Sequence, residues 1–208
     1  MEVYSANNRL TLSRNIMRVA ITGSSGLAKV IGDMIAKTAY IGTIHIVGHH
    51  RVEDILDSDW VWKENDVFIN CAHVEFEQCK LLMEAFEAWK DDETKTIINI
   101  SSRAAQPNIS KGYMYAAQKA ALNHLASNLT WNSDKKCRIT TMNLGLMNHD
   151  TLPSISHNEV ASWIYRHCTG SKHIDVPEIT LQNAANYQDV QSDKDTLRTL
   201  EFNRSIFP

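Results

Sequence analysis

Long apolar runs are absent from this sequence of 208 residues. No stretch approaches the roughly 18 apolar residues that a membrane-spanning helix needs, and the polar amino-terminal segment lacks the pattern of a secretory signal. The four cysteines form no C-x-x-C pair and have no spacing typical of a zinc site; they are Cys71, Cys79, Cys137 and Cys168. We therefore expect a cytoplasmic protein without a membrane segment or a metal, whose thiols stay reduced.

A strong excess of either charge is also missing. The formal net charge is -3 at pH 7, which gives no electrostatic reason to expect binding to nucleic acid. The hydrophobic content is 43%, and a chain of this length can bury one sizeable core but not two. The sequence therefore predicts one domain over residues 16–182, with an extension at residues 1–15 and a tail at residues 183–208.

Short apolar segments alternate with longer segments of helical character along the chain. The candidate strands are Met17–Ile21, Thr43–Val47, Val67–Asn70, Thr96–Ser101, Arg138–Asn143 and His173–Ile179. The candidate helices are Leu27–Thr38, Glu75–Lys90, Met114–Asn132 and Asn158–His167. Such alternation is typical of a parallel sheet covered by helices on both faces, so we predict a Rossmann-like, doubly wound α/β fold.

Three polar residues stand at an informative spacing in the middle of the chain. Ser102 closes a strand-like run, Tyr115 follows 13 residues later, and Lys119 lies four residues beyond it. Four residues are about one helical turn, so the phenol and the ammonium share one face of the predicted helix. A cation beside a phenol favours the phenolate, as a general acid working at cellular pH requires, and a serine hydroxyl could hold the oxygen that receives the proton. Taken alone, the Tyr–Lys pair would also suit an ordinary helix surface.

A second signal is a glycine-containing turn near the amino terminus. Thr22-Gly23-Ser24-Ser25-Gly26 separates the first candidate strand from the first candidate helix. Such a turn directs backbone N–H groups and the positive end of the helix dipole at one point, which suits a pyrophosphate. A simple tight turn is the alternative interpretation.

Together the two segments resemble the short-chain dehydrogenase/reductase family, and the resemblance extends over most of residues 17–181. Asn99-Ile100-Ser101-Ser102 matches the strand end that carries the family's catalytic serine, and Tyr115-Ala116-Ala117-Gln118-Lys119 fills its Tyr-x-x-x-Lys motif. Asn70-Cys71-Ala72-His73 matches two of the four residues of its Asn-Asn-Ala-Gly segment. The resemblance implies that Ser102, Tyr115 and Lys119 are catalytic. It also implies cofactor contacts from Gly23, Ser24, Ser25, Gly26, Leu27, Asn70, Ala72, Tyr115, Lys119, Gly145 and Met147.

The sequence departs from the family pattern at several points. Ala28 or Lys29 replaces the last glycine of the turn, and Leu144 replaces the proline that precedes the family's glycine beside the nicotinamide. Only Gly48 to Phe68 fills the space in which the family has a further strand and helix. No asparagine lies between Asn70 and Asn99, so the family's helix asparagine has no assignable counterpart. We therefore expect a shortened member of the family.

The end of the second candidate strand bears on the choice of cofactor. NAD sites of this fold place an acidic residue there, whereas a basic residue accommodates the 2′-phosphate of NADP. Here His49, His50 and Arg51 follow Gly48, so NADP(H) is favoured over NAD(H), with Arg51 as the strongest candidate because its charge is permanent. Asp57 or Asp59 could still supply an acidic group near the adenine, although an exposed loop aspartate is the simpler interpretation.

These observations favour an oxidoreductase that reduces a carbonyl group, or oxidises an alcohol, of a small molecule. The alternatives are a cofactor-binding sensor or scaffold without turnover, and an interaction protein that acts through residues 183–208. The candidate helix Glu75–Lys90 carries more apolar groups than one buried face needs, so we expect a homodimer or homotetramer.

Overall fold

The computed structural model describes residues 15–38, 43–56, 58–107, 112–171 and 173–185. The strands are β1 (Asn15–Thr22), β2 (Thr43–His50), β3 (Val67–Asn70), β4 (Thr96–Ser102), β5 (Arg138–Leu144) and β6 (Glu178–Leu181). The helices are α1 (Gly26–Lys37), α2 (Val52–Ile55), α3 (Asp59–Glu64), α4 (Glu77–Trp89), α5 (Tyr113–Trp131) and α6 (His157–Thr169), with a short 3-10 helix η1 (Arg103–Ala105). The predicted extension at residues 1–15 and tail at residues 183–208 fall mostly outside the described ranges, so the domain limits stay predictions.

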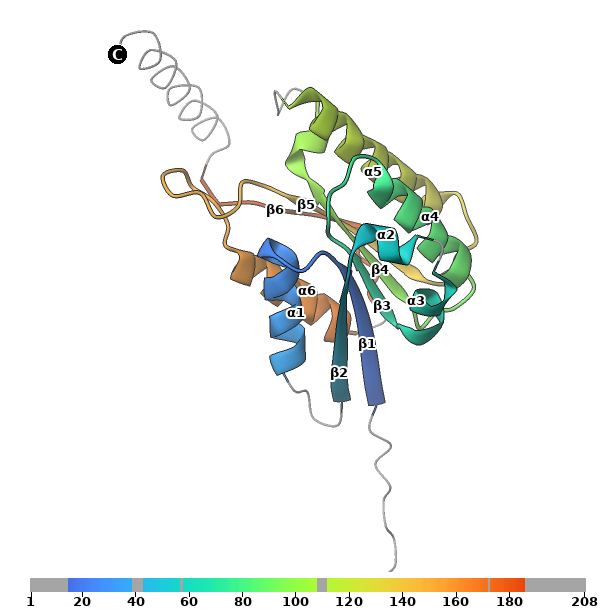
Figure 1. Ribbon diagram of the computed structural model, residues 1–208. Coiled ribbons are helices and arrows are strands. Elements are labelled where there is room, and N and C mark those ends of the chain that lie inside the picture. The colour runs from blue at the N-terminus through green and yellow to red at the C-terminus, as the bar shows by residue number, and fades with distance from the viewer. Residues whose placement is uncertain (1–14, 39–42, 57, 108–111, 172, 186–208) are drawn as a thin grey trace, which may run out of the picture.

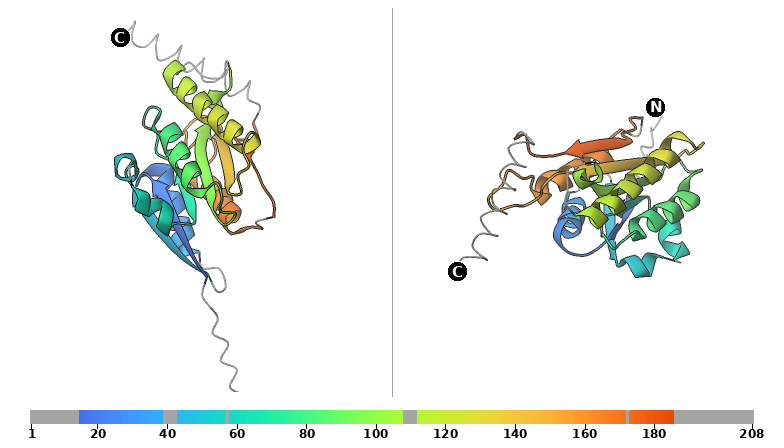
Figure 2. Two further views of the ribbon diagram at one scale, coloured as in Figure 1. Left: turned by 90° about the vertical axis from the view of Figure 1, so that its right-hand side faces the viewer. Right: turned by 90° about the horizontal axis from the view of Figure 1, so that it is seen from above.

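The described strands form one parallel sheet in the order β2-β1-β3-β4-β5-β6. Helices α1 and α6 cover one face of the sheet, and α2, α3, α4 and α5 cover the other (Figures 1 and 2). The predicted Rossmann-like, doubly wound fold is therefore confirmed.

The inner strands are buried because both of their faces are covered. Every residue of β3 and β5 is buried, and β4 is buried up to Ser102. The sequence of β3 is nearly all apolar, as suits a parallel strand that packs against helices on both sides, whereas β4 and β5 also bury polar residues such as Asn99, Thr140 and Asn143. Edge strands β2 and β6 instead alternate between half-buried and exposed positions.

Several boundaries differ from the sequence-based expectation, and two of these differences have a clear physical cause. The last strand covers Glu178–Leu181 and not His173–Ile179. Pro177 precedes it, and proline has no N–H to donate to a neighbouring strand. Helix α4 begins at Glu77, because Glu75 has a φ of 42°, outside the helical region.

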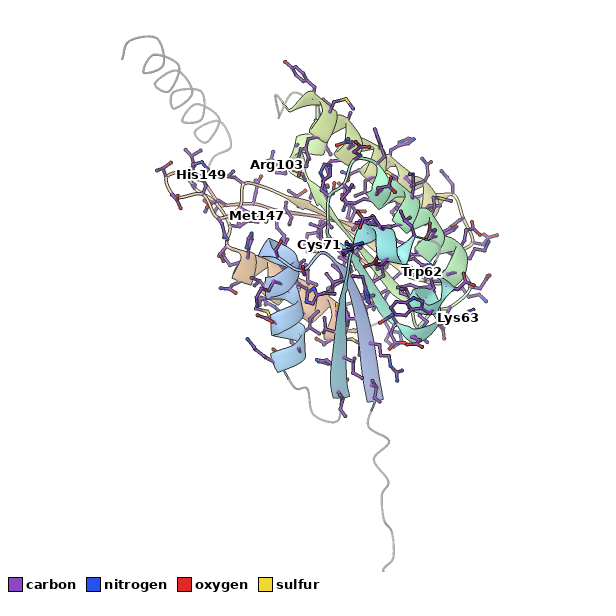
Figure 3. All side chains as sticks on the ribbon, in the orientation of Figure 1. Trp62, Lys63, Cys71, Arg103, Met147 and His149 are labelled. Atoms are coloured by element: carbon purple, nitrogen blue, oxygen red, sulfur yellow. The ribbon has the colours of Figure 1, made fainter. Side chains whose placement is uncertain are left out.

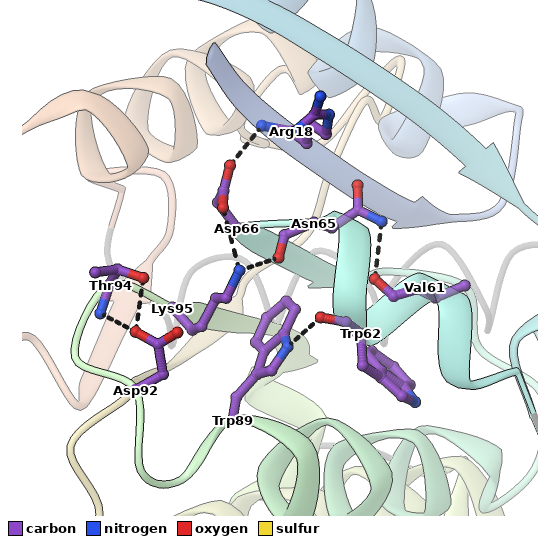
Figure 4. A network of polar contacts seen from close by, with 9 residues as sticks. All are labelled: Arg18, Val61, Trp62, Asn65, Asp66, Trp89, Asp92, Thr94 and Lys95. Carbon is purple, nitrogen blue, oxygen red and sulfur yellow. Dashed lines mark hydrogen bonds and ion pairs between the residues drawn. The ribbon is translucent and has the colours of Figure 1, made fainter. Parts of the chain in front are cut away.

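The space between β2 and β3 is filled by the short helices α2 and α3, which the sequence did not predict. Trp62 of α3 packs edge-on against Phe68 and Trp89, with ring centroids 5.0 and 5.8 Å away. The Nε1 of Trp89 donates a hydrogen bond of 2.8 Å to the carbonyl oxygen of Trp62 (Figure 4). A pair of buried indoles thus closes this face of the sheet between β2 and β3.

A polar network fixes α3 to the amino-terminal end of the sheet. Asp66 follows α3, and its carboxylate accepts a hydrogen bond from the backbone N–H of Arg18 in β1 (2.9 Å). The same carboxylate forms an ion pair with Lys95 (3.2 Å), as Figure 4 shows. Lys95 also donates to the carbonyl oxygen of Asn65 (2.7 Å). The carboxyl-terminal end of the inserted segment is therefore fixed against β1 and the start of β4.

Within the described ranges, none of the helices has the length and apolar character that crossing a bilayer would take.

Candidate active site

The carboxyl ends of four strands meet at one edge of the sheet, where ligands bind in open α/β sheets. The glycine-containing turn follows β1, Asn70 ends β3, Ser102 ends β4, and Gly145 follows β5. Register pairs Asn70 with Asn99 and Ser102 with Leu144, so the predicted motifs arrive side by side. Figure 3 shows the labelled Cys71, Arg103, Met147 and His149 toward this end, away from Trp62 and Lys63.

Tyr115 and Lys119 lie together on α5 as the spacing predicts. The Lys119 Nζ is 5.7 Å from the centroid of the Tyr115 ring. Lys119 is only 3% exposed, whereas Tyr115 is 38% exposed, so the ammonium sits inside while the phenol reaches the surface. In an ordinary Tyr–Lys pair on a helix surface both side chains would be exposed, whereas here the charged group is buried and only the hydroxyl-bearing ring is accessible.

The Lys119 ammonium is held by two oxygen atoms. Its Nζ donates to the Oε1 of Gln78 in α4 (2.6 Å) and to the carbonyl oxygen of Ile100 in β4 (2.8 Å). Burial lowers the pKa of Lys119 to about 8, and the neighbouring thiols of Cys71 and Cys79 oppose that shift. Lys119 therefore carries its charge at neutral pH and loses it just above.

Gln78 is a site residue that the sequence-based reasoning missed. It is 3% exposed, and its Nε2 donates to the carbonyl oxygens of Asn70 (2.8 Å) and Ile100 (3.1 Å). Asn70 is fully buried, and its amide donates to the backbone oxygen of Gln78 (2.8 Å) and to Asn99 (3.1 Å). A lone glutamine among apolar residues of a predicted helix was the only available signal.

Ser102 lies where the 3-10 helix η1 begins, and η1 packs against α5. Its Oγ accepts a hydrogen bond from the backbone N–H of Ala104 (3.1 Å). This contact fixes the side chain and does not use the hydroxyl proton. The hydroxyl of the adjacent Ser101 donates to the Oδ1 of Asn123 in α5 (2.5 Å), whereas Ser102 is the last residue of β4.

His73 is a second neighbour that the sequence did not single out. Its ring lies edge-on to Tyr115 with centroids 4.9 Å apart, and its Nε2 is 3.0 Å from the Oε1 of Gln118. Burial, and then the charge of Lys119, lower the pKa of His73. A neutral imidazole therefore borders the phenol at neutral pH.

The glycine-containing turn has the features of a phosphate cradle. Gly23 and Gly26 have φ values of 89° and 52°, and a Cβ at Gly23 would lie 3.4 Å from the Cβ of Ala72. Helix α1 starts at Gly26. The side chain of Ser25, the N-cap residue, makes no capping hydrogen bond to the first backbone N–H groups of the helix. The exposed Ser24 and Ser25 and these amides fit a phosphate group. Leu27 is buried, so only its backbone can contribute there.

Thr22 couples this turn to the end of β3. Its Oγ1 accepts hydrogen bonds from the backbone N–H groups of Cys71 (2.7 Å) and Ala72 (2.8 Å). The Gly23 and Ala72 segments, both predicted to contact the cofactor, are therefore adjacent.

The three basic residues at the end of β2 point in different directions. The Nδ1 of His49 lies 2.8 Å from the carbonyl oxygen of Gly23, and because that oxygen can only accept, Nδ1 carries the proton of this hydrogen bond. The ring of His49 fills the space beside Gly32 of α1. His50 packs against Trp60, with ring centroids 5.3 Å apart, and burial followed by the nearby His49 lowers the pKa of His50. The Arg51 side chain is exposed on the protein surface, with its Nε 3.3 Å from the Oδ2 of Asp54. Of the acidic alternatives, Asp59 pairs with Lys63, and Asp57 lies outside the described residues.

The segment after β5 is short and close to β6. The Gly145 N–H donates to the carbonyl oxygen of Leu181 (2.8 Å), and a Cβ at Gly145 would come within 2.9 Å of the Cβ of Gln182. Met147 packs against the core beneath α1 and α6 and pairs with Ile155 in an isolated bridge. In the part of the chain that is described, no three metal-ligating side chains come together.

Comparison with known proteins supports the motif-based resemblance. A family model described as short chain dehydrogenase matches residues 62–160, which include Ser102, Tyr115 and Lys119. This match confirms the resemblance predicted from the motifs. No curated protein matches the sequence.

Several solved structures share the fold. The serine dehydrogenase from Escherichia coli is similar with a TM-score of 0.66 and 16% identity, covering 82% of this chain and 99% of that one. The alcohol dehydrogenase from the archaeon Thermococcus sibiricus, complexed with 5-hydroxy-NADP, has a TM-score of 0.62 and 14% identity, covering 83% and 98%. The 3-alpha-hydroxysteroid dehydrogenase from Pseudomonas sp. B-0831, complexed with NADH, has a TM-score of 0.59 and 15% identity, covering 79% and 94%. At these identities the likeness establishes the fold.

Proposed function

We propose that this chain, which carries the motifs and the fold of the short-chain dehydrogenase/reductase family, is an NAD(P)(H)-dependent oxidoreductase that reduces a carbonyl of a small molecule or oxidises the corresponding alcohol. The observation that carries the proposal is the buried Lys119 ammonium 5.7 Å from the ring of the accessible Tyr115. Four unpaired cysteines are consistent with a place in the cytoplasm.

Each residue of the trio has a separate task. Tyr115 donates a proton to the carbonyl oxygen, and the hydroxyl of Ser102 donates a hydrogen bond to the same oxygen. Lys119, whose Nζ lies 5.7 Å from the centroid of the Tyr115 ring, stabilises the phenolate that remains. When bound, the reduced nicotinamide supplies the hydride. Gln78 and Ile100 accept hydrogen bonds from Lys119, which keeps its charge in place.

The turn between β1 and α1 would hold the cofactor's phosphates. Ser24, Ser25 and Gly26 offer backbone amides and hydroxyls at the positive end of a helix of 12 residues. Gly23, whose own N–H donates to the carbonyl oxygen of His50 (2.8 Å), shapes the turn and lets the phosphate approach its backbone. Lys119 uses two of its N–H groups on Gln78 and Ile100, and we assign it the nicotinamide ribose as a further partner.

Turnover is tested by following NADPH oxidation with a panel of small aldehydes and ketones. An oxidoreductase should give saturable loss of reduced-nicotinamide absorbance with at least one compound. Tight binding of NADPH without turnover of any compound would favour the sensor or scaffold instead.

We also propose that NADP(H) is preferred over NAD(H), with Arg51 as the group that recognises the 2′-phosphate. Arg51 lies directly after β2, and its ion pairs with Asp54 and Glu53 are exposed, so they are weak and easily exchanged for a phosphate. His50, whose pKa is lowered, is neutral at pH 7 and adds no charge.

Arg51→Ala should raise the dissociation constant of NADPH by about 5- to 150-fold, which corresponds to the loss of about 1–3 kcal/mol from a charge-assisted hydrogen bond. The dissociation constant of NADH should change little, so the preference of the protein for NADPH over NADH should become smaller. Fluorescence titration measures both constants, and Lys37→Ala, which removes an exposed charge at the far end of α1, is the matched control. Equal constants for NADH and NADPH in the unmodified protein would remove the basis for this assignment.

The oligomer is proposed to form through α4 and α5. Leu82, Phe86 and Trp89 of α4 pack into the protein's own core. Met83 on the same helix and Phe76, which precedes it, are exposed. Trp131 at the end of α5 is 71% exposed. These aromatic and apolar groups support a contact between two copies.

Light scattering of the unmodified protein should therefore give the mass of a homodimer or homotetramer. Met83→Glu should shift it toward a single chain, because a carboxylate in an apolar contact is costly to desolvate. A mass of one chain for the unmodified protein in dilute native solution would contradict the proposal.

A further inference from the structure

The amide of Gln78 is held in one orientation by its neighbours. Its Nε2 lies 2.8 Å from the carbonyl oxygen of Asn70 and 3.1 Å from that of Ile100. Both partners can only accept hydrogen bonds, so the NH2 group must face them and the Oε1 must face away. The atom that faces the Lys119 Nζ at 2.6 Å is therefore an acceptor.

The backbone of Gln78 is fixed as well. Its carbonyl oxygen accepts from the Asn70 side chain at 2.8 Å, and Gln78 lies in the first turn of α4. The Ile100 carbonyl oxygen accepts from both Gln78 and Lys119, so α4, β4 and α5 are joined at a single point. A displacement of Gln78 would move the ammonium.

Gln78 is also the neutral member of an otherwise ionisable surrounding. The titratable groups that face Lys119 are Cys71 after β3, Cys79 on α4, His73 in the loop before α4, and Tyr115 on its own helix. Burial raises the pKa of Cys71 to about 11 and also raises that of Cys79, so neither thiol supplies a negative charge at neutral pH. Oxygen dipoles, and no counter-ion among these groups, stabilise the ammonium there.

We propose that Gln78 is a positioning residue that sets both the location and the proton affinity of the Lys119 ammonium, through a direct side-chain contact from α4. Its catalytic consequence rests on the proposed function, since it acts on Tyr115 only through Lys119. A neutral acceptor keeps the full positive charge available to the phenolate, whereas a carboxylate at the same place would cancel it.

The test is a pH titration of the Lys119 side chain by NMR in the full-length, cofactor-free protein with isotope-labelled lysine, with the resonance assigned by its loss in Lys119→Arg. The unmodified protein should show a midpoint pKa of about 8. Gln78→Glu should raise the midpoint by about one unit or more, because a negative charge favours the ammonium. Gln78→Met, which has similar length and no acceptor, should lower it by about one unit. Gln106→Glu adds the same charge at an exposed site beside Arg103, and this variant should leave the midpoint of Lys119 unchanged.

Opposite shifts in the two Gln78 variants support the inference, and a merely structural role would not produce them. If Gln78→Glu does not fold, Gln78→Met decides alone, and a midpoint within about 0.3 units of the unmodified value overturns the inference. Shifted midpoints in a protein that turns over no carbonyl would uphold this role and reject the proposed function. Turnover of a carbonyl compound together with unshifted midpoints would uphold the proposed function and reject this role of Gln78.

Discussion

Tyr115→Phe should lower kcat for carbonyl reduction by about 10²- to 10⁴-fold, the usual contribution of a positioned general acid. The dissociation constant of NADPH should stay nearly unchanged. The substitution removes one hydroxyl and keeps the ring, so the edge-on contact with His73 and the position of Lys119 over the ring are preserved. Steady-state kinetics and fluorescence titration on the same preparation measure the two effects.

A matched control lies two residues earlier. Tyr113 begins α5 and is 79% exposed, so Tyr113→Phe removes the same hydroxyl from a place with no role in the chemistry. Its kcat should equal that of the unmodified protein. Wild-type turnover by Tyr115→Phe on a confirmed substrate would show that another group donates the proton.

Lys119→Ala should have a larger effect, because kcat and affinity for NADPH should fall together. The variant loses the charge that stabilises the phenolate and the proposed ribose contact. It also leaves the buried Oε1 of Gln78 without its donor, which costs about 1–3 kcal/mol of folding free energy. Unfolding curves are therefore needed beside the kinetics, to show that the loss of activity exceeds any loss of folded protein.

The pH dependence gives a second view of the same residue. Burial lowers the pKa of Lys119 to about 8, so the ammonium loses its proton as pH rises through that value. The rate of carbonyl reduction should then fall above about pH 8, since a neutral amine does not stabilise the phenolate. Lys90→Ala, which removes a lysine paired with Glu87 at the end of α4, should keep the unmodified profile and affinity. An unchanged kcat in Lys119→Ala would exclude Lys119 from the proton transfer.

The central sheet was predictable because local sequence determines it. β3, β4 and β5 are short segments rich in β-branched and other apolar residues, separated by long helical segments, and that alternation indicates a parallel sheet. The short helices α2 and α3 were not predictable. They have four and six residues, too few for helical periodicity, and the contact of Trp62 with the distant Trp89 holds α3 in place.

The site shows the same division. The spacing of Tyr115 and Lys119 within one helix fixes their common face, so their proximity could be predicted. The partners of Lys119 could not, because Gln78 is 41 residues away and meets it only through the packing of α4 against α5. Likewise, the ring of His49 turns toward Gly23 and Gly32 because the glycine in α1 leaves room for it, which no local pattern reveals.

The most direct test of the proposed reaction is isotope transfer from NADPH labelled with deuterium at the transferable position of the nicotinamide. With a substrate found in the panel, the alcohol product should carry deuterium on the carbinol carbon, and Tyr115→Phe should form that product at least about 10²-fold more slowly. Mass spectrometry of the product gives the answer. An alcohol without deuterium, or equal rates of labelled product from both proteins, would contradict hydride transfer assisted by Tyr115 and Lys119.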